Sequence, residues 1–126
     1  MKEAEMRTEE LERTAEINLL YDFYGELLPE KQQQLFRLHH QDDLSLSEIG
    51  EELGITRQGV HDFLRRAENR LRACEKTLGL AEKFRRTEQQ RQEAAKALDA
   101  LIKKHSRDPA LQEELLRIKG VIEGLE

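Results

Sequence analysis

Residues 44–72, which read LSLSEIGEELGITRQGVHDFLRRAENRLR, contain the strongest local folding signals of this 126-residue chain. Ser45 is followed three residues later by Glu48, which is the spacing of a capping box. In that motif each side chain bonds the backbone amide of the other residue at the start of a helix. Gly54 predicts the end of this helix, because glycine readily takes the left-handed conformation found there. Thr56 then predicts the start of a second helix.

The two helices are predicted over about 46–53 and 57–78 and are joined only by Leu53-Gly54-Ile55. A three-residue turn that contains glycine makes the helices cross steeply. Gly50 is small where they would approach most closely. Apolar residues occur where the helices must pack on each other and on a preceding helix: Ile49, Leu53, Ile55, Val60 and Phe63. This pattern predicts a helix-turn-helix rather than an unrelated helical hairpin.

Upstream, apolar residues recur at helical spacing and predict two further helices. The first carries a wide apolar face: Ile17, Leu20, Tyr21, Tyr24, Leu27 and Leu28. Pro29 ends that helix and can occupy the first turn of the next, which is predicted over about 29–40. Three residues of this second helix are expected to face inward: Leu35, Phe36 and Leu38.

Downstream, Gly79 interrupts the helices, and residues 80–105 form a long, highly charged helical stretch. Asp108-Pro109 predicts the start of a last helix. Its apolar residues alternate at spacings of four and three: Leu111, Leu115, Ile118, Ile122 and Leu125. Packing against the chain itself and dimerisation are both open. Because the apolar stripes are long and narrow, they favour a homodimer.

Composition agrees with an all-α fold, since 37% of the residues are charged and only 5% are aromatic. The chain is expected to divide into three parts: a polar, frayed or disordered lead-in (1–14), a helix-turn-helix domain (15–79) and a C-terminal helical extension (80–126). The net charge of −5 is unevenly distributed. Residues 1–30 carry three bases against nine acids, whereas residues 57–72 carry five bases against two acids. This basic middle permits binding of a polyanion.

If the helix that begins after Thr56 enters a major groove, its first turns face the bases. The candidate nucleic-acid-binding residues are then Thr56, Arg57, Gln58, His61, Arg65 and Arg66. Arginine can form hydrogen bonds with guanine, and glutamine can form them with adenine. Threonine and the backbone amides of the first helical turn can bind phosphate. Asp62 opposes this reading because a carboxylate repels phosphate, although it could accept from a cytosine amine. Alternatively, the arginines are solvated surface charges or contact protein.

No sequence pattern of catalysis or cofactor binding is found. The chain has no glycine-rich phosphate loop, nucleophile elbow or paired buried carboxylates, so neither an enzyme nor a cofactor is expected. His39 and His40 are adjacent and are expected to point to different faces of a helix, without partners for a metal site. Cys74 is alone, and no secretory signal or membrane span is apparent, so a cytoplasmic location is expected.

Residues 28–72 resemble the fourth domain of sigma factors, which reads promoter DNA. Three segments carry this resemblance: Leu28–Gln32 (LPEKQ), Leu44–Gly50 (LSLSEIG) and Arg57–Val60 (RQGV). The run Asn18–Gly25 (NLLYDFYG) is not a sigma feature. Together with the overall length and Val60-His61-Asp62, it resembles the small bacterial YlxM family, over about residues 17–80.

The YlxM resemblance implies a sigma-like helix-turn-helix fold without sigma activity and a role in the signal recognition particle pathway. Two functions stay open. The first is a DNA-binding regulator that acts as a homodimer. The second is an accessory protein that binds the protein subunit of the signal recognition particle or its RNA. In the second case the basic stretch 76–107 would face RNA, or the apolar stripe after Pro109 would face protein.

Overall fold

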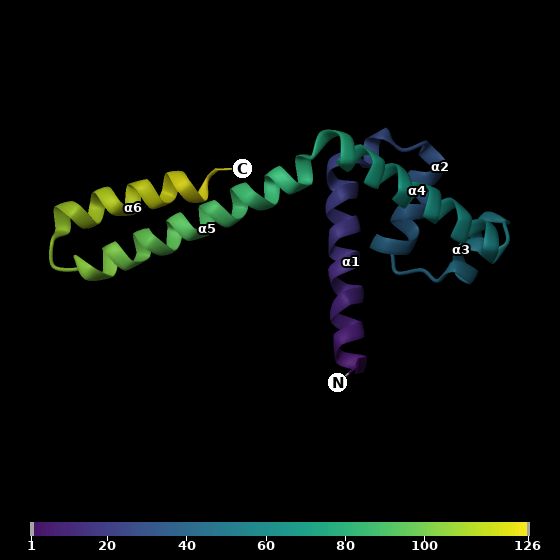
Figure 1. The fold of residues 1–126 in the computed structure, drawn as a ribbon, viewed down its shortest axis with the longest axis horizontal. Coiled ribbons are helices and arrows are strands. Elements are labelled where there is room, and N and C mark those ends of the chain that lie inside the picture. The colour runs from purple at the N-terminus through teal and green to yellow at the C-terminus, as the bar shows by residue number, and fades with distance from the viewer. Residues whose placement is uncertain (1, 126) are drawn as a thin grey trace. The chain divides into compact units, whose positions relative to one another are not determined.

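The computed structural model describes residues 2–125, and within them it contains helices and no strands (Figure 1). The predicted all-α class is therefore confirmed. The elements follow in this order: α1 (Lys2–Tyr24), the 3-10 turn η1 (Gly25–Leu27), α2 (Glu30–Phe36), the π-helical turn η2 (Arg37–Gln41), α3 (Leu46–Leu53), α4 (Arg57–Leu78), α5 (Leu80–Lys104) and α6 (Pro109–Glu123). The chain forms two compact units, one ending at Ala81 and the other beginning at Glu82.

The segment expected to be a frayed or disordered lead-in, residues 1–14, is helical from Lys2 onward as part of α1. All side chains from Lys2 to Glu16 are exposed, so this part of α1 has no buried face that periodicity could reveal. Its composition explains the helix. Glutamate, arginine, alanine and leucine favour helix, and no glycine or proline interrupts the sequence before Gly25.

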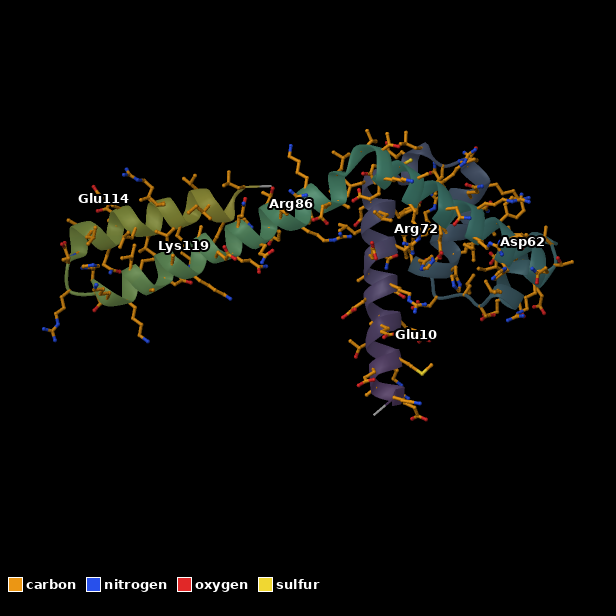
Figure 2. All side chains as sticks on the ribbon, in the orientation of Figure 1. Glu10, Asp62, Arg72, Arg86, Glu114 and Lys119 are labelled. Atoms are coloured by element: carbon orange, nitrogen blue, oxygen red, sulfur yellow. The ribbon has the colours of Figure 1, made fainter. Side chains whose placement is uncertain are left out.

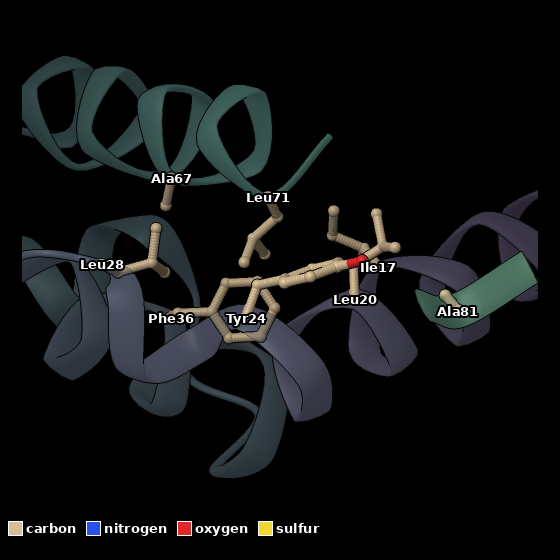
Figure 3. Close-up of a cluster of buried hydrophobic side chains, with 8 residues drawn as sticks. All are labelled: Ile17, Leu20, Tyr24, Leu28, Phe36, Ala67, Leu71 and Ala81. Carbon is tan, nitrogen blue, oxygen red and sulfur yellow. The ribbon is translucent and has the colours of Figure 1, made fainter. Parts of the chain in front are cut away.

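The first unit has a main core to which four helices contribute (Figure 3). Its buried residues are Ile17, Leu20, Tyr24, Leu28, Phe36, Ala67, Leu71 and Ala81. The ring of Tyr21 stacks on that of Phe36 with centroids 4.3 Å apart. The core therefore joins α1 and α2 to the middle of α4 and to the first turn of α5.

A hydrogen-bonded group closes one side of this core. The Tyr24 hydroxyl donates to Glu75 Oε1 over 2.7 Å and accepts from the amide of Leu80 over 3.0 Å. Glu75 Oε1 also accepts from the amide of Ala81 over 3.0 Å. Burial raises the pKa of Tyr24, and its bond to Glu75 adds to this rise. Because Leu80 and Ala81 open α5, these bonds satisfy amides that the helix itself leaves unpaired.

The turn η2 brings two histidines together. The His40 ring stacks on Phe36 at 4.2 Å and meets the His39 ring edge-on at 4.9 Å. The two side chains nevertheless have different surroundings, because His39 Nδ1 lies 2.9 Å from the carbonyl oxygen of Leu44. Burial lowers the pKa of His40, and the neighbouring His39 lowers it further.

The second unit is an antiparallel hairpin of α5 and α6. Asp108 caps α6 as predicted, accepting from the amide of Leu111 over 3.2 Å. The Gln112 side chain donates to the carbonyl oxygen of His105 over 2.9 Å and ties α6 to the end of α5. Within residues 2–125, no helix is long and apolar enough to cross a membrane.

Candidate nucleic-acid interface

The start and end of α3 are set by the residues that the sequence indicated. The amide of Glu48 donates to Ser45 Oγ over 3.1 Å, and the amide of Ser45 donates to Glu48 Oε1 over 3.2 Å. Both halves of the predicted capping box are thus present. Gly54 ends the helix with φ of 69°, in the left-handed conformation expected for it.

Gly50 permits the tight turn between α3 and α4. Its carbonyl oxygen accepts from the amide of Ile55 over 3.0 Å. A Cβ atom placed on Gly50 would lie 2.7 Å from the carbonyl oxygen of Ile55, which is too close for any side chain. The prediction that a small residue is needed where the two helices approach is confirmed.

A second, smaller core holds α3 and α4 against α2. Its buried members are Leu35, Ile49, Val60 and Leu64. Six partly buried residues pack around them: Leu38, Leu44, Leu46, Leu53, Ile55 and Phe63. All the residues expected to pack between the two helices of the motif are therefore found in this cluster. The rigid core leaves the opposite side of α4 facing solvent.

All six candidate residues lie on that outer side or at the start of α4, and all six are exposed: Thr56, Arg57, Gln58, His61, Arg65 and Arg66. The Thr56 hydroxyl accepts from the amide of Gly59 over 3.0 Å, so it also caps the helix. In the described part of the chain, the arginines at 57, 65 and 66 form no ion pair. Their charges are therefore available to a ligand.

Asp62, which Figure 2 labels on α4, directly follows the candidate residue His61. Gln58, one turn earlier, donates its side-chain amide to Asp62 Oδ1 over 3.1 Å. His61 Nδ1 lies 3.7 Å from the same oxygen. Arg65 and Arg66 follow Asp62 by three and four residues, which is the spacing of neighbours on a helix surface. The Asp62 carboxylate thus contacts two of the candidate residues, Gln58 and His61, and is a neighbour of two more, Arg65 and Arg66.

Lys31 of α2 is a basic residue of this interface that the sequence pattern did not indicate. Its Nζ lies 5.8 Å from the ring centroid of Phe63, a distance typical of a cation–π contact. Phe63 and Arg66 are one turn apart on α4, so Lys31 extends the basic surface of α4 onto α2. No local signal could have revealed this, because the contact depends on how α2 packs on α4.

No metal site accompanies the interface in the part of the chain that the structure describes. Within residues 2–125, no three histidine, cysteine, aspartate or glutamate side chains gather closely enough to hold a metal ion. Cys74 is half-buried and packs against the main core.

The capped α3–turn–α4 unit, with its dedicated core and exposed outer face, defines an all-α protein of the helix-turn-helix class. The chain belongs to the UPF0122 family, described as "Putative helix-turn-helix protein, YlxM / p13 like", which matches residues 11–114. The resemblance to the YlxM family is thereby confirmed.

Relatives in several bacteria match between about half and nearly all of the chain. A UPF0122 protein of Thermoanaerobacter sp. (strain X514) is 39% identical over 109 residues, which cover 86% of this chain and 92% of the relative. A UPF0122 protein of Bacillus cereus (strain AH187) is 40% identical over 116 residues, covering 92% of this chain and 99% of the relative. A UPF0122 protein of Desulforamulus reducens is 54% identical over 68 residues, which are 54% of this chain and 58% of the relative.

Proposed function

We propose that this protein is a non-enzymatic regulatory protein that binds double-stranded DNA through the exposed face of α4 and acts as a homodimer. One observation carries the DNA-binding part of the proposal. Three arginines without ion pairs in the described residues (Arg57, Arg65 and Arg66) project from the second helix of a helix-turn-helix. In such motifs this helix enters the major groove.

The residues of the face divide by what they can contact. Arg57 and Gln58 belong to the first turn of α4, which in this class of motif lies nearest the base edges. Arginine there suits guanine and glutamine suits adenine, provided that Gln58 exchanges its bond to Asp62 for one to a base. Lys31 of α2 and Arg66, on the side of α4 next to α2, suit backbone phosphates.

The proposal is tested by selecting duplexes from a random pool and measuring their affinity by fluorescence anisotropy at several salt concentrations. Arg57→Ala and Arg65→Ala are expected to weaken binding, and each lost phosphate contact lowers the salt slope by about one. Arg117→Ala, which removes an exposed arginine from α6, is the matched control. Absence of any salt-sensitive duplex binding would contradict the proposal.

A second candidate function is that of an accessory protein of the signal recognition particle, bound to its protein subunit or its RNA. The YlxM resemblance motivates it, and the Asp62 carboxylate favours contact surfaces other than α4 because it repels phosphates there. Its contact surfaces would be residues 76–107 for RNA or the apolar stripe after Pro109 for protein. Purification from the native host, with and without nuclease, distinguishes the two functions by what accompanies the protein.

A further inference from the structure

An ion pair joins the two helices of the α5–α6 hairpin on one flank. Lys119 Nζ lies 2.7 Å from Asp99 Oδ1 and 3.7 Å from Glu123 Oε1 (Figure 2). The hydrogen bond to Asp99 raises the pKa of Lys119. One flank of the hairpin is thus polar and bridged between the two helices.

The opposite flank exposes several apolar side chains. Ile118, Val121 and Leu125 follow one another on α6 at spacings of three and four residues and are 45%, 63% and 57% exposed. At 3.6 residues per turn they lie on the side of α6 away from Lys119. On α5, Leu101 is 43% exposed and lies on the side away from Asp99. In an antiparallel pair these two sides form one surface, which we call the apolar face.

We infer that the apolar face, formed by Leu101, Ile118, Val121 and Leu125, binds the same face of a second copy of this chain to make a four-helix bundle. This inference rests on the homodimer in the proposed function and names the surface that would form it. A two-fold axis places identical surfaces against each other, so one apolar face suffices for both copies.

The hairpin has almost no hydrophobic core of its own, which favours packing against a second copy. Among residues 82–125, Leu115 is the only hydrophobic residue that is buried. Two helices of this length cannot enclose an interior, and chains of about 40 residues usually need a metal, disulfides or oligomerisation to be stable. Four helices packed around their apolar stripes do enclose one.

Charge also favours a second copy as the occupant. Residues 82–125 carry ten bases and eight acids, so two such hairpins repel each other little. A nucleic acid would instead require basic side chains, whereas this face presents aliphatic side chains and, one turn before Ile118, the exposed Glu114.

The size of the face predicts a weak dimer. The 15 residues of α6 extend about 22 Å, and two adjacent helices are roughly 20 Å wide, which gives on the order of 450 Å² per copy. Both copies together bury about 900 Å², less than the roughly 1,600 Å² of a standard stable interface. We therefore expect dissociation in the micromolar range.

Sedimentation equilibrium of the full chain, without nucleic acid and up to about 100 μM, tests the inference. The test variant is Val121→Glu, and the matched control is Leu116→Glu, which adds the same charge at a site 55% exposed on the other flank of α6. We expect a concentration-dependent dimer that Val121→Glu weakens at least about ten-fold and Leu116→Glu less than about two-fold. If Val121→Glu loses helicity, Val121→Ser provides the milder test and should weaken the dimer in the same direction.

A wild-type chain that stays monomeric would overturn the inference, as would equal effects of the two glutamate substitutions. Fluorescence anisotropy with duplex DNA tests DNA binding separately from dimer formation. A monomer that binds DNA refutes the dimer and the apolar-face inference but not DNA binding. A dimer that is sensitive to Val121→Glu but binds no DNA retains the inference and refutes the DNA-binding function.

Discussion

The side-chain amide of Gln58 donates a hydrogen bond to Asp62 Oδ1 over 3.1 Å, on the outer face of the second helix of the motif. A carboxylate therefore holds one of the residues best suited to read a base. It also places a negative charge between basic side chains that would approach phosphates. Any nucleic-acid complex of α4 must overcome this repulsion, so the protein should bind duplex DNA less tightly than its arginines alone suggest.

Asp62→Asn is expected to raise the affinity for duplex DNA about three- to ten-fold, because it removes the repulsion between the carboxylate and the phosphates. Fluorescence anisotropy at fixed salt measures the change. Asp22→Asn removes the same charge from an exposed site on α1 and should have little effect. Weaker binding of Asp62→Asn would mean instead that the carboxylate accepts a hydrogen bond from cytosine.

Lys31→Ala is expected to weaken duplex binding and to lower the salt slope by about one, because it removes a phosphate contact at the edge of α4. Lys31→Arg keeps the charge and the contact with the Phe63 ring, so it should bind nearly as tightly as the wild type. Equal loss of affinity in both variants would show that Lys31 acts through packing and not through its charge.

Gly50→Ala should destabilise the first unit by about 1–3 kcal/mol, because the new Cβ would lie 2.7 Å from a backbone oxygen that cannot move away freely. Gly120→Ala is the matched control in α6, where nothing lies within 4 Å of the added atom. There alanine should be neutral or stabilising by up to about 1 kcal/mol. Urea denaturation measures both, and a Gly50→Ala variant as stable as the wild type would contradict the tight turn.

Tyr24→Phe should lower the free energy of unfolding by about 1–3 kcal/mol, since it leaves the amide of Leu80 and one bond of the Glu75 carboxylate unsatisfied. Tyr21→Phe retains the ring stacked on Phe36 and should change stability by less than about 0.5 kcal/mol. Thermal or urea unfolding compares the two. Similar stabilities for the two variants would mean that water replaces the Tyr24 hydroxyl without loss.

His40 should make the stability of the first unit depend on pH. Its pKa is lowered in the folded state from the ordinary value of 6.5, so the unfolded chain binds the proton more readily. Stability from this group is therefore complete above about pH 6.5 and is lost as the pH falls through that value towards the lower folded pKa.

His40→Phe, which keeps a ring against Phe36, should reduce the stability loss between pH 7 and 5 when urea unfolding is followed across this range. An identical pH profile in the His40→Phe variant would show that burial of His40 does not control the loss.

The sequence alone determined the features that depend on neighbouring residues. The helix caps use side chains and amides no more than three residues apart, and they are made by Ser45, Thr56 and Asp108. Such bonds form wherever the chain turns into a helix, so the starts of α3, α4 and α6 were predictable without knowledge of the fold. The left-handed Gly54 belongs to the same local group, and together these residues fixed the helix-turn-helix and placed the candidate side chains at the start of α4.

Only the tertiary structure decided which distant residues meet. Tyr24 and Glu75 are 51 positions apart, and Lys31 reaches Phe63 only because α2 packs on α4. Contacts of this kind depend on how whole helices cross, which no short window of sequence encodes. The exposed flank of α6 is a similar case. The apolar stripe of α6 is wider than the surface that α5 covers, so only the packing of the two helices determines which apolar residues are buried.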